Sequence, residues 1–296
     1  MNLKYLRMLP VMEYSTTPAP EPEGQQDGVV RITVDPGEQI PRRPDGVTLR
    51  RGLRYSEGLR LDLHTPSTPG PHPLVVYLPG GGFAAAPRAM ARRERAFIAA
   101  SGYAVASVQY RTTRQKATYR QGLADVQAAI GYLTGQAEDF GIDSEHIAVW
   151  GESAGGYLAS LVGLKDERIS AVVDKFGASD VSHLADGFDQ RMRSFLDNPD
   201  NSIHRYRAAE ANPADLARPG APAFLLLHGD DDRVIPPAQT LELHRALRAA
   251  GADSTRYLLR GAGHGHLALS GEQMRQWTSV QVMTLVRDFL DRNLRG

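Results

Sequence analysis

Short runs of consecutive apolar residues recur along the chain, and they constrain its fold more than any other feature. "LVVYL" at 74–78, "HIAVW" at 146–150 and "AFLLLH" at 223–228 show almost no polar alternation. Strands of this kind are expected in a parallel sheet that is covered on both faces. Helical patterns separate the runs, and this alternation predicts a doubly wound α/β fold.

The expected sheet is mostly parallel and has about eight strands. Its earliest strand candidates are spaced like antiparallel hairpin strands, whereas the later ones are the apolar runs. The strand candidates lie at 29–34, 52–55, 59–64, 74–78, 104–109, 146–150, 169–176, 223–228 and 255–260. The helix candidates lie at 88–101, 119–138, 154–165, 237–251 and 271–294.

Two segments interrupt this alternation. Residues 15–28 are rich in Pro, Glu, Gln and Gly, which predicts a flexible linker and makes 1–28 an N-terminal arm. The remaining residues, 29–296, are expected to form one domain. Within it, 177–222 is longer than the usual crossover of an α/β unit and contains several large apolar residues. Those residues suit either ordinary packing or a small helical cap over a pocket, and we expect the cap.

The composition excludes several classes of function. Lys plus Arg and Asp plus Glu both number 34, so no net charge favours nucleic acid or an anionic membrane. The absence of cysteine excludes disulfides and thiolate catalysis, and it fits a cytoplasmic protein. No segment approaches the ~18 consecutive apolar residues of a membrane span. Pro10 and Glu13 also interrupt the N-terminal apolar run too early for a signal peptide. We therefore expect neither a nucleic-acid partner nor a membrane partner.

The strongest local signal is the segment "VWGESAGGYLAS" at 149–160. Gly151, Ser153 and Gly155 have the G-x-S-x-G spacing, with a buried strand before the serine and an alanine-rich helix after it. On such a sharp strand-to-helix turn, a bulky residue two positions from the serine would clash with the adjoining strand or helix. The turn exposes the serine Oγ and aims N–H groups of the helix N-terminus at a developing oxyanion. The motif therefore predicts a nucleophilic serine.

A nucleophilic serine needs an orienting acid and a basic histidine, which in this type of fold follow it in that order. "FLLLHGDDDRVIP" ends a strand at His228 and then supplies three aspartates, 230–232. "LRGAGHGH" ends the next strand and presents His264 in a glycine loop. Three aspartates beside a histidine also suggest a metal site, but no further cluster has the spacing of metal ligands. We expect His228 to be structural, because it lies on the strand side of its loop.

Together these segments resemble the α/β-hydrolase superfamily, in particular the carboxylesterases related to hormone-sensitive lipase and to bacterial feruloyl and acetyl esterases. The resemblance runs from "LRLDLHTP" near residue 59 to the C-terminal helix. It includes "GGGF" at 80–83, "QYR" at 109–111, "GESAGG" at 151–156 and "NP" at 212–213.

This resemblance implies a role for each candidate. The family's HG-x-x-D pattern selects Asp232 among the three aspartates, and its GxGHG pattern selects His264 over His266. Ser153 would be the nucleophile. The oxyanion would be held by the backbone N–H groups of Gly81, Gly82 and Ala154. The family usually has a histidine where this chain has Pro79, and we expect the loop to work without it.

We expect a serine carboxylesterase that acts on small or medium acyl esters, with no metal and no organic cofactor. Its candidate pocket walls are Phe83, Tyr157, Phe188, Met192 and Phe195, although plain packing explains them equally well. An amide or formamide hydrolase, or a biosynthetic tailoring hydrolase, would use the same site. A non-catalytic ligand receptor on this fold would typically lack one member of the triad. A small-molecule ester is the expected partner, and an exposed C-terminal helix or edge strand leaves a homodimer open.

Overall fold

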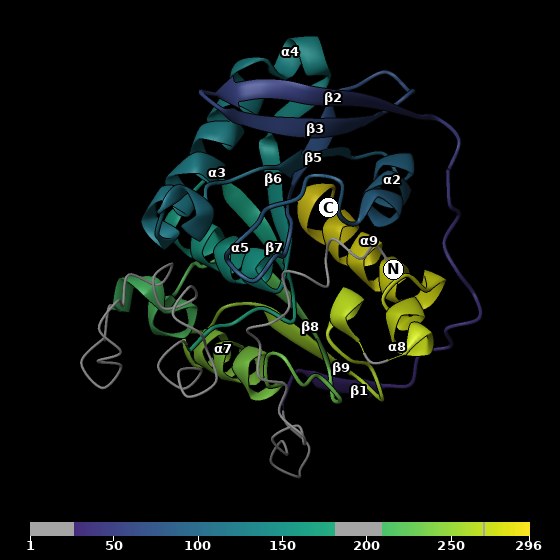
Figure 1. Cartoon of the computed structure of the whole chain (residues 1–296), viewed down its shortest axis with the longest axis vertical. Coiled ribbons are helices and arrows are strands. Elements are labelled where there is room, and N and C mark those ends of the chain that lie inside the picture. Colours follow the sequence, from purple (N-terminus) through teal and green to yellow (C-terminus); the bar gives the residue numbers. More distant parts are fainter. Residues whose placement is uncertain (1–26, 181–208, 269) are drawn as a thin grey trace.

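The computed structural model describes residues 27–180, 209–268 and 270–296, which fold around one nine-stranded sheet (Figure 1). The strand order is β1-β9-β8-β7-β6-β4-β5-β3-β2. The strands are β1 Val29–Ile32, β2 Val47–Ser56, β3 Leu59–Pro66, β4 His72–Leu78, β5 Ala104–Val108, β6 Ile142–Glu152, β7 Ile169–Lys175, β8 Ala223–Gly229 and β9 Ser254–Leu259. The α-helices are α2 Arg92–Ala100, α3 Tyr119–Gly135, α4 Ala137–Phe140, α5 Ala154–Lys165, α7 Ala238–Ala249, α8 Gly271–Gln276 and α9 Val280–Leu294.

The sheet is parallel from β1 through β5 and antiparallel at the other edge, where β3 pairs with β5 and β2 with β3. This confirms the predicted doubly wound α/β fold, and each of the nine strands overlaps one of the nine strand candidates. The hairpin expected of the earliest strands is correct for β2 and β3 but wrong for β1. Strand β1 instead lies parallel to β9 at the opposite edge, with Val29 opposite Arg256.

The misplaced β1 has a physical explanation. After Ile32 the chain crosses from one edge of the sheet to the other before β2 begins (Figure 1). A strand of four residues with an exposed centre carries no apolar pattern that would identify its neighbour. Its pairing therefore depends on the exposed edge that β9 offers, which only the assembled sheet creates.

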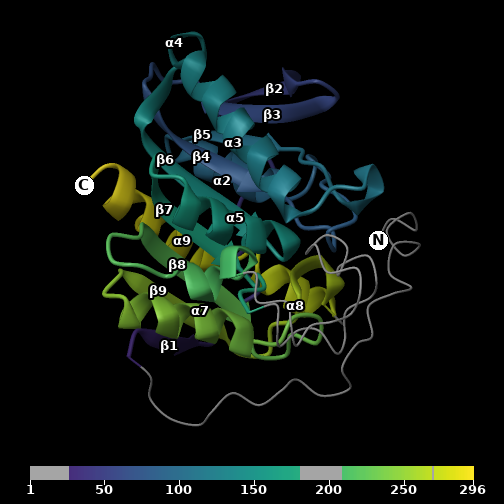
Figure 2. The same cartoon turned by 90° about the vertical axis from the view of Figure 1, so that its left-hand side faces the viewer.

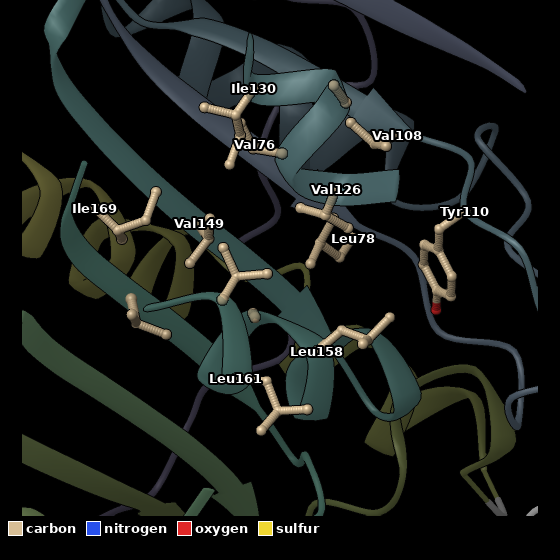
Figure 3. Close-up of a cluster of buried hydrophobic side chains, with 14 of the residues drawn as sticks. Val76, Leu78, Val108, Tyr110, Val126, Ile130, Val149, Leu158, Leu161 and Ile169 are labelled. Atoms are coloured by element: carbon tan, nitrogen blue, oxygen red, sulfur yellow. The ribbon is translucent and has the colours of Figure 1, made fainter. Parts of the chain in front are cut away.

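Helices cover both faces of the sheet, α3, α5 and α7 on one and α2 and α9 on the other (Figures 1 and 2). On the first face, Val76 and Leu78 of β4 lie in one apolar cluster with Ile130 of α3 and Leu158 of α5 (Figure 3). Tyr77, between them in β4, belongs to the cluster on the second face. Because successive side chains point to opposite faces, a strand covered twice must be apolar throughout. This explains the continuous apolar runs of the sequence.

The predicted helix 271–294 is two helices, α8 and α9. The Trp277 indole N–H between them donates a hydrogen bond to Gly263 O at 2.9 Å, which draws the chain toward the loop after β9. Ser279 then starts α9 anew, because its Oγ accepts a hydrogen bond from the Val282 N–H at 3.2 Å. Among the described residues, no helix combines the length and apolar character that crossing a membrane requires.

Candidate active site

The carboxyl ends of β6, β8 and β9 lie at the same edge of the parallel sheet, where α/β folds place their ligands. Ser153 follows β6, Asp232 follows β8 and His264 follows β9. Three segments far apart in the sequence thus deliver the three predicted residues to one place.

Ser153 occupies a sharp turn between β6 and α5, with φ 56° and ψ −122°. This left-handed backbone is costly for a residue with a side chain, and it is typical of constrained functional positions. The flanking glycines make the turn possible. A Cβ at Gly151 would lie 2.0 Å from Gly155 O, and one at Gly155 would lie 2.0 Å from Leu78 O. No other residue type fits at either position.

A hydrogen-bonded chain connects the three side chains. His264 Nε2 lies 2.9 Å from Ser153 Oγ, and His264 Nδ1 lies 2.6 Å from Asp232 Oδ2. Ser153 is only half-buried, whereas His264 is 4% exposed and Asp232 1% exposed. The arrangement leaves the serine oxygen accessible and shields the histidine–aspartate contact from water. His264 can take a proton from Ser153 Oγ, and Asp232 can stabilise the resulting imidazolium.

The environment of Asp232 favours its ionised form. Burial by itself would raise the pKa of this carboxyl. The charge of His264 and the hydrogen bonds from His228 and His264 outweigh burial, and they hold the pKa well below its usual range. Asp232 Oδ1 also accepts hydrogen bonds from the N–H groups of Val234 at 2.8 Å and Ile235 at 2.9 Å. The carboxylate is therefore fixed by both of its oxygens.

The other two aspartates of the triple have separate partners. Asp230 Oδ1 accepts from the Gly261 N–H at 2.6 Å, which ties the loop after β8 to the loop after β9. Asp231 forms an ion pair with Arg233 at 3.1 Å and accepts from the Gln273 amide at 2.7 Å. In the part of the chain that the structure describes, no group of three potential metal ligands is found.

The loop after β4 lies directly against the nucleophile. A Cβ at Gly80 would lie 2.8 Å from Glu152 O and 3.2 Å from Ser153 Cβ, so glycine permits this approach. Gly82 has φ 57°, in the left-handed region that favours glycine. The expected oxyanion donors are the N–H groups of Gly81, Gly82 and Ala154, and within the described ranges none of them donates to a backbone carbonyl.

Two side chains and one backbone N–H that the sequence did not single out for this role hold the same loop. Tyr110 Oη donates to Pro79 O at 2.7 Å, and Thr112 Oγ1 donates to Ala84 O at 3.1 Å. The Thr113 N–H donates to the carbonyl of Phe83 at 3.1 Å. All three donors follow β5: Tyr110 lies within the "QYR" segment, and Thr112 and Thr113 come directly after it. They anchor the loop by its carbonyls, which a proline at position 79 leaves intact.

Glu152, beside the nucleophile, forms a buried ion pair. Its Oε1 lies 2.9 Å from Lys175 Nζ, and the two side chains are 6% and 1% exposed. The Lys175 carbonyl in turn accepts the Ser153 N–H at 2.9 Å. The apolar pattern of β7 contained this lysine as an exception, but nothing in the sequence indicated its partner.

Of the predicted pocket walls, Phe83 and Tyr157 are described, and both are fully buried in the apolar cluster. Their rings meet edge to face at 5.6 Å, and Tyr157 Oη donates to Ala211 O at 2.7 Å. Phe188, Met192 and Phe195 lie outside the described residues, as does most of the predicted cap. The roles of all five residues stay predictions.

Sheet order, helix placement and the strand–turn–helix at Ser153 are those of an α/β-hydrolase. The sequence model of the BD-FAE family matches residues 61–247, which is more than half of the chain. The chain belongs to this family, and its recognition as an α/β-hydrolase of the carboxylesterase type is confirmed.

Individual proteins show the same likeness. Esterase LipC of Mycobacterium tuberculosis (strain ATCC 25618 / H37Rv) is 32% identical over 221 residues, covering 68% of this chain and 55% of LipC. Isoprenylcysteine alpha-carbonyl methylesterase ICME of Arabidopsis thaliana is 28% identical over 246 residues, covering 75% of this chain and 57% of ICME. A truncated form of a carbohydrate esterase from gut microbiota has a TM-score of 0.75 at 21% identity, covering 86% of this chain and 100% of that one. The chain thus spans about half the length of the curated relatives that it matches.

Proposed function

We propose that this protein is a carboxylic ester hydrolase that works through an acyl-enzyme on Ser153. The observation that carries the proposal is the unbroken hydrogen-bonded chain from Ser153 Oγ through His264 to Asp232. The esterase names of LipC and ICME support an ester as the substrate class. A small or medium acyl group is the expected acid part of that ester.

The geometry supports two steps of acyl transfer. Ser153 Oγ attacks the ester carbonyl while His264 Nε2 accepts the hydroxyl proton and then returns it to the leaving alcohol. Asp232 holds the imidazole orientation through Nδ1 and stabilises its positive charge. The N–H groups of Gly81, Gly82 and Ala154 stabilise the tetrahedral oxyanion. Water, deprotonated by the same histidine, then releases the acid from Ser153.

The decisive experiment measures the hydrolysis of p-nitrophenyl acetate, butyrate and octanoate by the wild type and by Ser153→Ala. Removing the nucleophile should lower kcat by as much as ~10⁶-fold. Ser56→Ala, an exposed serine at the end of β2, should leave kcat unchanged and serves as the control. Equal hydrolysis by Ser153→Ala, or a wild type that neither turns over these esters nor reacts with a fluorophosphonate probe, would refute the proposal.

A further inference from the structure

The aspartate of the proposed triad is bonded by a second histidine. His228 ends β8, and its Nε2 lies 3.3 Å from Asp232 Oδ2, the same oxygen that contacts His264. We infer that His228 is a positioning residue of the ester hydrolase, which acts on His264 by orienting Asp232. This inference rests on the proposed function, and it goes beyond the expectation that His228 is structural.

The hydrogen-bond donors around the Asp232 carboxylate show what His228 adds. A carboxylate offers roughly four lone-pair sites, two on each oxygen. Oδ1 of Asp232 accepts the N–H groups of Val234 and Ile235, and Oδ2 accepts His264 Nδ1 at 2.6 Å. His228 supplies a fourth, shared donor, because its single Nε2–H is hydrogen-bonded to the Ile235 carbonyl at 3.0 Å and also faces Oδ2 at 3.3 Å. The side chains of Asp232 and His228 are both 0% exposed, so bulk water cannot replace that donor.

The partners of His228 determine which nitrogen carries its proton. Nε2 faces two acceptors, Asp232 Oδ2 and the Ile235 carbonyl at 3.0 Å, and therefore has to be the protonated nitrogen. Nδ1 lies 2.9 Å from Thr240 Oγ1. That oxygen accepts a hydrogen bond from Arg256 Nε at 3.0 Å. The threonine O–H has two acceptors, the Pro237 carbonyl at 3.3 Å and Nδ1 at 2.9 Å, and Nδ1 is the closer of the two.

A directed chain of hydrogen bonds follows. It runs from Arg256 through Thr240 to His228, whose Nε2 meets Asp232 in a 3.3 Å contact, and from there His264 continues it to the nucleophile. Arg256, Thr240 and His228 are all fully buried in this chain. Rotation of the Asp232 carboxylate would break a bond at each oxygen, so its plane is fixed relative to the His264 ring. Without His228, only the short contact to His264 would hold Oδ2.

Packing also links the two histidines. The Phe176 ring lies 4.7 Å from the His264 ring and 6.5 Å from the His228 ring, so one side chain holds both imidazoles. A Cβ on Gly265 would lie 2.8 Å from Phe176 Cζ, which shows how closely the loop after β9 approaches this ring. The two histidines and Asp232 therefore form one packed unit.

The test compares His228→Leu, which removes the donor, with His228→Gln, whose amide nitrogen replaces Nε2 as a donor. His228→Leu should lower kcat for p-nitrophenyl butyrate roughly 10-fold to 100-fold with little change in KM, well short of the ~10⁴-fold loss when a triad aspartate is neutralised. His228→Gln should recover most of the loss. Equal kcat in the wild type and His228→Leu, or an equal loss in both variants, would overturn the inference.

His244 provides a matched control. It is also buried, with a hydroxyl on one ring nitrogen, Ser254 Oγ at 2.9 Å, and a carbonyl on the other, Asp27 O at 2.8 Å. It lies beside the amino end of β9, at the opposite end of that strand from His264. His244→Leu should lower stability without changing kcat. A fall in kcat equal to that of His228→Leu would mean that a buried histidine matters only for stability.

A second readout does not depend on turnover. ¹⁵N–¹H NMR of the histidine rings should show His228 protonated on Nε2 and not on Nδ1. The His264 Nδ1–H resonance should shift in His228→Leu and should stay near its wild-type position in His228→Gln. An Nδ1–H tautomer of His228, or a His264 resonance unaffected by either variant, would overturn the positioning role. If the wild type fails to hydrolyse esters while these NMR results hold, the proposed function fails and the inference about Asp232 geometry stands.

Discussion

The buried ion pair beside the nucleophile allows a quantitative prediction, tested by a double-mutant cycle with Glu152→Gln and Lys175→Met. The two charges are 2.9 Å apart and almost inaccessible to water. At an effective dielectric constant of ~20, that separation corresponds to about 6 kcal/mol of attraction. The cost of removing both ions from water offsets much of this gain. The net value of the pair is therefore smaller than the attraction.

Each single substitution should be severe, because it leaves one buried charge without its partner. We expect each to lower the free energy of unfolding by about 3–5 kcal/mol. Lys175→Met should also affect Glu94, a buried carboxyl. Burial and the charge of Glu152 raise the pKa of Glu94, and Lys175 opposes that shift. The double variant should cost less than the sum of the two, because it leaves no buried charge without its partner. Methionine also still packs near the Trp150 and Trp277 rings that Lys175 now covers.

The assay is chemical denaturation of all four proteins at pH 7.5. This pH is chosen because the pKa of Glu152 is lowered despite its burial, chiefly through the charge of Lys175. A carboxyl with a depressed folded-state pKa contributes its stability above the unfolded value of about 4.5, and the contribution is lost as the pH falls through the folded-state value. Strictly additive losses in the double variant would refute the reasoning, as would a loss below ~1 kcal/mol for Lys175→Met.

Two further predictions concern glycine and a buried acid. Gly155→Ala places a Cβ 2.0 Å from Leu78 O and should lower kcat/KM by more than ~10²-fold. Gly131 is exposed on α3, and a Cβ added there would meet no atom within 4 Å outside its own helix backbone. Gly131→Ala should therefore raise the free energy of unfolding by ~0.5–1 kcal/mol. Comparable activities of the two variants would contradict this. Asp174 accepts hydrogen bonds from Ser160 Oγ and the Gly177 N–H, yet burial raises its pKa to about 7. Because the folded-state pKa is raised, its contribution to stability is full below about pH 3.8 and is lost as the pH rises through 7. Relative to Asp174→Asn, the wild type should lose about 4 kcal/mol over this range in urea unfolding, and parallel pH profiles would refute the assignment.

The fold could be predicted because several independent signals agreed at each central strand. Each run had the length, apolar content and flanking turn residues of a buried parallel strand, and a helical pattern followed it. The G-x-S-x-G motif likewise combined a strand, a turn and a helix around Ser153. The loops that carry Asp232 and His264 are reached by the same logic, because the carboxyl ends of parallel strands meet at one edge. The choice of Asp232 among three aspartates, and of His264 over His266, came from the family resemblance. The partner of β1 and the break between α8 and α9 were not predictable, since each depends on contacts that exist only after assembly.

The residues that support the site could not be predicted from the sequence for a different reason. Lys175, His228 and Arg256 interrupt apolar strands, and a hydropathy pattern treats each of them only as an exception. A fully buried polar side chain requires a partner, so such an exception in a central strand predicts a contact even where it does not identify one. Here the contacts lead to the site: Lys175 reaches the residue before the nucleophile, and Arg256 acts through Thr240 on His228 and the acid. In a doubly wound sheet, polar interruptions in the strands next to the nucleophile therefore deserve testing as parts of the catalytic support before they are assigned to the core.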